Sequence, residues 1–502
     1  MRAGLGRNVL ASLANAGTGI GIALLTTPLI LHAVGTAGYG VWTLTTAFVL
    51  YLAIAEAGIG PAAQRFVAVA HGRGDLGGAA RILWTSVALY ALVGAVVCVA
   101  LVLLAEPIIG LFDIPAQLEG DGARLLRLVG PALLLGLVAI AIGNVQQGLE
   151  RFTAVAAATA AGSVVYLGAI AVLVAGDAGL DELGYALVLQ QAVFVVLRLA
   201  TVRDVLATGP PRFVSRSELS ELVAFSAKLQ VSVLSLLING QSDKVVVGLV
   251  APAATVGQLG IATQASEAGR LVGAAGLVPM ISRLSAHAGA RDEPRLVAEY
   301  ERLNRLWLIA VIGATTIAAA TLHPLISGWL GDGYGEAVLL GEFLVVAYGV
   351  SLLPGTRIAY LRATNRVGLE AQLGAVTIAL NILFTVPLAL AFGARGVVAG
   401  TLAAYVLGVV FFLWRFERVA PAARATPASA LLRAAGIGLA LGALALGWGM
   451  AMLALLPSGF ALVPIVAGVL VALIAYLGAA LGVRPTPSRL AAALGEAPPS
   501  RG

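Results

Sequence analysis

The chain has 502 residues, of which 60% are hydrophobic and only 11% are charged. A soluble domain carries about 25% charged residues, so this composition excludes a water-exposed globular surface, and its high hydrophobicity excludes a disordered chain. The single cysteine, Cys98, excludes a disulfide framework and a multi-thiolate metal site. A polytopic membrane protein remains. The net charge of +6 would also suit a nucleic-acid-binding protein, so the positions of the basic residues decide between the two.

Fourteen mostly apolar stretches are long enough to cross a bilayer as helices. We expect spans at residues 9–31, 40–63, 82–105, 125–147, 154–175, 183–202, 222–249, 257–282, 304–327, 338–360, 371–392, 396–414, 431–456 and 460–482. The first apolar stretch is too long for a cleaved signal peptide and lacks a small-residue cleavage site, so it is expected to stay as an anchor. The predicted fold is therefore all-α.

Basic residues gather in alternate loops. With the N-terminus in the cytoplasm, the inner segments hold 26 of the 31 Lys and Arg residues, and the outer loops are acidic. This is the positive-inside pattern of membrane proteins, and it places both termini in the cytoplasm. Nucleic-acid binding loses its support, because topology explains the basic residues. The 29 Arg residues against 2 Lys are typical of a GC-rich bacterium, so we expect the bacterial cytoplasmic membrane.

The two halves of the chain resemble each other. Residues 58–65 match residues 276–283 at an offset of 218, and both stretches end an even-numbered span. We therefore predict parallel repeats, a design in which transporters bind substrate between the halves. The expected parts are an N-lobe of six helices (1–202), a cytoplasmic linker (203–221), a C-lobe of six helices (222–418), two further helices (419–483) and a tail (484–502).

Polar residues form a stripe on the first helix of each half. Ser12 and Asn15 lie on one face of the first span, and Ser235 and Asn239 lie on one face of the seventh. Small polar residues also hold helices together in lipid, which is the alternative interpretation. The length of the stripe favours a water-lined cavity.

Charged residues inside spans are costly and need a reason, since each costs roughly 2.5–3.5 kcal/mol at the bilayer centre. Glu56, Asp243, Lys244, Glu267 and Arg270 are such residues. Glu267 and Arg270 are three apart, so they share a helix face and form either a self-neutralising pair or part of a site. Arg270 is the best candidate for an anionic ligand, because a guanidinium matches phosphate oxygens.

Motifs of enzymes and pumps are missing from the sequence. It has no G-x-x-x-x-G-K-[ST], no H-E-x-x-H and no Cys/His cluster, so we expect no ATP-driven pump, no metal and no cofactor. A membrane polymerase or glycosyltransferase usually has a large outer loop or early acidic pair, whereas the first outer loop here is tiny and has no acid. The chain is therefore expected not to be an enzyme.

Several short motifs, in order along the chain, resemble the polysaccharide-biosynthesis flippases of the multidrug/oligosaccharidyl-lipid/polysaccharide exporter superfamily. They are Pro28 to Leu31, Val34 to Gly40, Glu56 to Gly60 with Arg65, Asp243 to Gly248, Val256-Gly257, Pro279, Arg283 and Gly393 to Gly396. The resemblance implies two six-helix lobes around a central cavity, with two added C-terminal helices. It also implies alternating-access transfer of an undecaprenyl-diphosphate-linked oligosaccharide to the outer leaflet, with Glu56 and Asp243 at acidic positions of the family.

On this hypothesis Arg270 meets the diphosphate, and Asn15, Ser235 and Asn239 meet sugar hydroxyls, with Ser12 on the same stripe. Glu56, Asp243 or Glu267 are the candidates for coupling to protons or sodium. Membrane lipids, a polysaccharide polymerase and glycosyltransferases are the expected partners. Three alternatives stay open. A cation-coupled drug exporter usually stops at twelve helices, a lipid II flippase has basic residues inside the first helix, and a membrane polymerase or glycosyltransferase is the least favoured.

Overall fold

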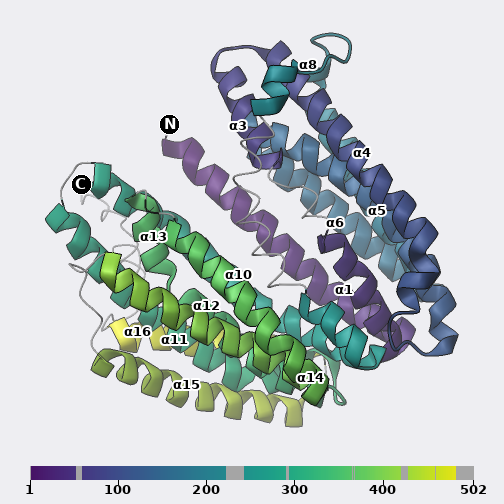
Figure 1. Ribbon diagram of the computed structural model, residues 1–502. Helices are drawn as coiled ribbons and strands as arrows, with labels where there is room; N and C mark the ends of the chain where they lie inside the picture. The colour runs from purple at the N-terminus through teal and green to yellow at the C-terminus, as the bar shows by residue number, and fades with distance from the viewer. Residues whose placement is uncertain are drawn as a thin grey trace, which may run out of the picture. The chain divides into compact units, whose positions relative to one another are not determined.

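The computed structural model describes residues 2–51, 59–221, 242–289, 293–364, 366, 368–419, 428–457 and 459–481. Within these ranges the chain is helical and contains no strand, as Figure 1 shows, which confirms the predicted all-α class. Ten of the described helices are long and apolar enough to cross a membrane.

The helices follow the predicted spans in order. They are α1 (Arg2–Tyr51), α3 (Ile59–Gly72), α4 (Leu76–Ile109), α5 (Ala116–Gly148), α6 (Phe152–Ala175), α7 (Leu183–Thr201), α8 (Arg203–Leu206), α10 (Ala253–Gly289), α11 (Glu293–Leu330), α12 (Gly335–Leu352), α13 (Gly355–Ala363), α14 (Gly368–Val419), α15 (Ala428–Leu455) and α16 (Leu462–Leu481). Residues 242–250, at the end of the seventh predicted span, are also helical. Both α1 and α14 consist of two helices, joined at Gly35 (φ +68°) and Gly393 (φ +60°).

The chain forms two compact units, residues 1–260 with 392–394, and residues 261–391 with 395–502. In the first unit α4 packs along α5, and glycines allow the close approach: a Cβ on Gly94 would lie 2.9 Å from Leu134 Cδ1, and one on Gly130 would lie 3.2 Å from Cys98 Sγ. Small residues at helix contacts are the usual way to gain van der Waals packing inside a bilayer. The predicted lobe boundary at 203–221 stays a prediction.

Charged residues at the end of the first unit predicted to face outward are paired. Arg124 Nε donates to Asp181 at 2.6 Å, and Arg127 Nη2 donates to Glu106 at 2.6 Å. The acidic loops expected from the sequence thus neutralise the two arginines at this end.

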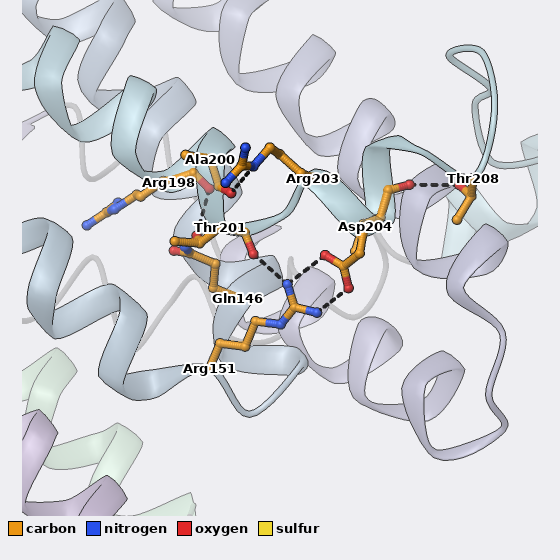
Figure 2. Close-up of polar contacts among 9 residues, drawn as sticks. Gln146, Arg151, Arg198, Ala200, Thr201, Arg203, Asp204 and Thr208 are labelled. Atoms are coloured by element: carbon orange, nitrogen blue, oxygen red, sulfur yellow. Dashed lines mark hydrogen bonds and ion pairs between the residues drawn. The ribbon is translucent and has the colours of Figure 1, made fainter.

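At the opposite end of the first unit, polar groups join α5, α6, α7 and α8 (Figure 2). Arg151, just before α6, donates to the carbonyl oxygen of Thr201 at 2.5 Å and to Asp204 Oδ1 at 2.8 Å. Gln146 of α5 donates to the Thr201 hydroxyl. The hydrogen bonds from Arg151 lower the pKa of Asp204 to about 2, and those to Asp204 raise the pKa of Arg151. The end of α7, which has free carbonyl groups, is therefore capped by a cation.

In the second unit α11 is the central helix. It contacts α12 on one side and the C-terminal pair α15 and α16 on another. Tyr476 of α16 is fully buried, and its hydroxyl donates to the carbonyl oxygen of Ile309 at 2.7 Å. Gly313 makes room for this ring, because a Cβ there would lie 2.0 Å from it.

Equivalent contacts recur in the two units. Arg366 donates to the carbonyl oxygen of Val419 at 2.9 Å, as Arg151 does to Thr201. A Cβ on Gly349 of α12 would contact Thr315 of α11, as a Cβ on Gly130 of α5 would contact Cys98 of α4. Both pairs recur near the sequence offset of 218, so they support the predicted internal repeat.

Candidate functional site

A tight hairpin within α1 carries the motif from Val34 to Gly40. The chain reverses at Gly35, whose positive φ favours glycine. Tyr39 is buried, and its hydroxyl lies 3.3 Å from that of Thr27 on the preceding helix and also bonds the Thr43 side chain. The hairpin is thus fixed by a buried hydroxyl network, and such satisfied networks give a unique local structure.

Residues 242–260 belong to the same compact unit and pack onto this hairpin. A Cβ on Gly40 would lie 1.7 Å from the carbonyl oxygen of Ala253, and one on Gly257 would lie 2.5 Å from that of Thr36. The amide of Ala253 donates to the carbonyl oxygen of Asp113 at 3.0 Å. The glycines quoted for the family resemblance therefore permit backbone contact between segments more than 200 residues apart, which agrees with a packing role.

Asp243 is the predicted site residue that the structure describes most fully. Its exposed fraction is 7%, and it lies one turn before the fully buried Val247 on the same helix face. Gly248 in the same segment packs against Phe112 and Leu44. An intramembrane carboxyl group buried on a packed face is a functional candidate by default, because burial of a charge is costly.

The middle of α10 carries a polar face. Thr263, Ser266, Glu267 and Arg270 fall within an arc of about 100°, since an α-helix turns about 100° per residue. Thr263 and Ser266 are buried, and the Ser266 hydroxyl donates to the carbonyl oxygen of Gly341 on α12 at 3.2 Å. The side chain of Glu267 is partly buried. The expected shared face of Glu267 and Arg270 follows from this continuous helix.

The remaining predicted residues stay predictions. Glu56, Ser235 and Asn239 lie outside the described residues. Ser12 and Asn15 on α1 and Arg270 on α10 lie on described helices, but their side chains are not among the described ones. Among the side chains that the structure describes, no group of three His, Cys, Asp or Glu residues could hold a metal ion.

Two features were not predicted from the sequence. The side chains of Thr26 and Tyr166 form a hydrogen bond between α1 and α6. The only sequence signal for it is the pair of hydroxyl residues Thr26 and Thr27 before Pro28. The second feature concerns Arg198, which lies near the inner end of the span expected at 183–202. Its guanidinium lies 5.3 Å from the Phe194 ring centroid and donates to the carbonyl oxygen of Ala139 at 2.6 Å.

Residues 5–329 match the family described as "Polysaccharide biosynthesis protein". No curated protein matches the chain by sequence. The fold is similar to that of the lipid II flippase MurJ in its inward closed conformation, with 12% identity, a TM-score of 0.70, and 94% of this chain and 98% of that one covered. An inward-facing multidrug resistance MATE family transporter of the MOP superfamily has 15% identity and a TM-score of 0.65, and the match covers 80% of this chain and 96% of the transporter. A point mutant of the Vibrio cholerae MATE transporter VcmN has 15% identity and a TM-score of 0.59, and the match covers 84% of this chain and 97% of VcmN.

Proposed function

The chain belongs to the polysaccharide biosynthesis protein family, and from this premise we propose that it is a flippase for a polyprenyl-linked glycan. The substrate is an undecaprenyl-diphosphate-linked oligosaccharide, which moves from the cytoplasmic to the outer leaflet by alternating access. The observation that carries the proposal is the polar face of α10 with Arg270, which lies in a chain otherwise depleted of charge. The membrane is the bacterial cytoplasmic membrane, with both termini inside.

Each polar group has a part suited to its chemistry. Arg270 offers the fork of donors that matches a diphosphate, and Ser12, Asn15, Ser235 and Asn239 offer hydrogen bonds to sugar hydroxyls. Glu56, Asp243 and Glu267 are carboxyl groups able to carry a proton or sodium ion during the cycle. No chemical bond changes in this process, so the chain acts as a transporter and hands the glycan to glycan-polymerising enzymes.

Lipid-linked substrates rank above drugs on one observation. The multidrug transporter is covered almost whole yet leaves 20% of this chain unmatched, whereas MurJ accounts for 94% of it. A lipid II flippase is therefore the second candidate.

Leaflet transfer in proteoliposomes tests the proposal. The purified protein is reconstituted with a radiolabelled undecaprenyl-diphosphate oligosaccharide on one side, and appearance on the other side is followed by a membrane-impermeant glycosidase. Arg270→Ala should reduce transfer at least about tenfold, because a charged hydrogen bond contributes about 1.5–3 kcal/mol, and Arg270→Lys should lose less.

Arg395→Ala is the matched control, since Arg395 is 63% exposed and pairs with Glu336 at the start of α12. It should transfer like the wild type. Transfer of lipid II alone would replace the first candidate with the second. Transfer of neither lipid above protein-free vesicles would refute both.

A further inference from the structure

An open cavity of about 300 Å³ lies within the second unit between α10, α11 and α12, and Ala314 in its lining is exposed. Small side chains create it: Ala310, Ala314 and Ala318 lie four residues apart on one face of α11. Val345 of α12 and Ala265 of α10 form the facing walls. We call this cavity the α10–α12 slot.

The lining of the slot extends along much of α11. Its lining on α11 runs from Trp307 to Leu325, and this distance is about 27 Å at 1.5 Å per residue. The hydrocarbon core of a bilayer is about 30 Å thick. Because most of the lining side chains are apolar, the slot suits a hydrocarbon chain.

Two of the polar groups that line the slot have partners within the protein. Trp307 Nε1 donates to the carbonyl oxygen of Leu352 at 2.7 Å. The Ser266 hydroxyl donates to the carbonyl oxygens of Ala262 at 2.7 Å and Gly341 at 3.2 Å. Water needs two to four polar partners to occupy a cavity, whereas apolar cavities bind apolar ligands. Thr315 and Tyr348 add two hydroxyls to the lining, and the other lining side chains are apolar, so the slot favours hydrocarbon over water.

In the second unit α15 packs against the other side of α11, where a Cβ on Gly442 would lie 3.1 Å from Ala320. The slot and α15 thus lie on opposite sides of α11.

The slot adjoins the proposed head-group site. Ser266 lines the slot and is four residues, or about one turn, before Arg270 on the same face of α10. A lipid with its diphosphate at Arg270 has the slot beside its first carbons.

We propose that the α10–α12 slot binds part of the polyprenyl tail of the substrate, with the tail beside Ser266 and the diphosphate at Arg270. This inference rests on the proposed function for the identity of the lipid. The tail then stays in contact with the protein, while the hydrophilic head group crosses the bilayer.

Photo-crosslinking tests the proposal directly. An undecaprenyl diphosphate with a diazirine in its tail is added to the protein in vesicles of phosphatidylethanolamine and phosphatidylglycerol, and labelled peptides are mapped. Labelling should fall on α11 and α12 residues of the slot. Ala314→Trp fills the slot and should reduce this labelling about tenfold or more, because excluding two or more buried methylene groups has that effect.

Two further variants keep the result interpretable. Ala318→Leu adds less volume, and it should reduce labelling even where Ala314→Trp does not fold. Ala451→Trp is the matched control, because Ala451 is exposed on α15 and should leave labelling unchanged.

Three results would overturn the proposal: labelling outside the slot, undiminished labelling in both filled variants, or equal labelling by a phosphatidylglycerol with the same diazirine in an acyl chain. Oligosaccharide transfer is measured on the same vesicles. Normal transfer without slot labelling refutes the tail site alone, and slot labelling without transfer refutes the proposed function alone.

Discussion

Replacing Arg151 with alanine should destabilise the first unit by about 1 kcal/mol. The guanidinium bonds both Asp204 and the carbonyl oxygen of Thr201, so it joins the start of α6 to the end of α7 and to α8 (Figure 2). The pKa of Asp204 falls from its ordinary 3.8 to about 2 because of these hydrogen bonds. For a pair shielded from water this fall corresponds to about 2 kcal/mol. Asp204 is 49% exposed, and solvent screening reduces the value to about 1 kcal/mol.

The same pair predicts a pH dependence. Because the pKa of Asp204 is lower in the folded than in the unfolded chain, the carboxylate stabilises the fold fully above about pH 5. This contribution is lost progressively as the pH falls toward about 2, where the folded carboxyl group also becomes protonated.

Thermal unfolding in detergent micelles measures both effects through a double-mutant cycle of Arg151→Ala and Asp204→Asn. At pH 7 the single variants should lower Tm by about 2–4 °C for 1 kcal/mol, and their effects should not add. Arg203→Ala is the control, since the Arg203 Nε donates to the carbonyl oxygen of the nearby Ala200 at 2.9 Å. A coupling energy below about 0.3 kcal/mol at pH 7, or one that is equal at pH 7 and pH 3, would refute the reasoning.

Two further substitutions test close packing by the same unfolding assay. Gly40→Ala should lower the free energy of unfolding by about 1–3 kcal/mol, because the added Cβ would lie 1.7 Å from the carbonyl oxygen of Ala253. In the part of α1 before Gly35, the Cβ added by Gly21→Ala meets nothing within 4 Å. Equal stability of these two variants would contradict the contact. Gly313→Ala should lower the free energy of unfolding by a similar amount, because the added Cβ would displace the Tyr476 ring. In the double variant, Tyr476→Ala should offset part of the loss caused by Gly313→Ala. Strictly additive effects would exclude this ring as the cause.

The sequence predicted the order of the helices well, and it located their ends poorly where charged turns extend beyond the bilayer. The span expected at 125–147 belongs to α5, which begins at Ala116. The turn before that span was predicted as a loop because it is charged, with Glu119, Asp121 and Arg124. In the fold Arg124 bonds both Asp121 and Asp181, so the charged turn remains helical outside the apolar span.

For the candidate site, helical periodicity predicted the shared face of Glu267 and Arg270, because that relation is local. It did not predict which helix covers that face. The contact between Gly40 and Ala253 joins segments 213 residues apart, and no local pattern encodes such a partner. The same holds for Arg198, because the span expected at 183–202 gives no sign that its guanidinium bonds the carbonyl oxygen of Ala139 on α5.

The connections at the end predicted to face outward are short. Between the described helices they are residue 35, residues 110–115, 176–182, 251–252 and 331–334, residue 393, and residues 456–461, so the longest has seven residues. Loops that fold over an opening in other proteins are commonly longer than about 12 residues. None of these connections has the reach of a lid. For the proposed transport cycle, this means that opening and closing on this side would fall to whole helices, two pairs of which are joined by a single residue, Gly35 or Gly393.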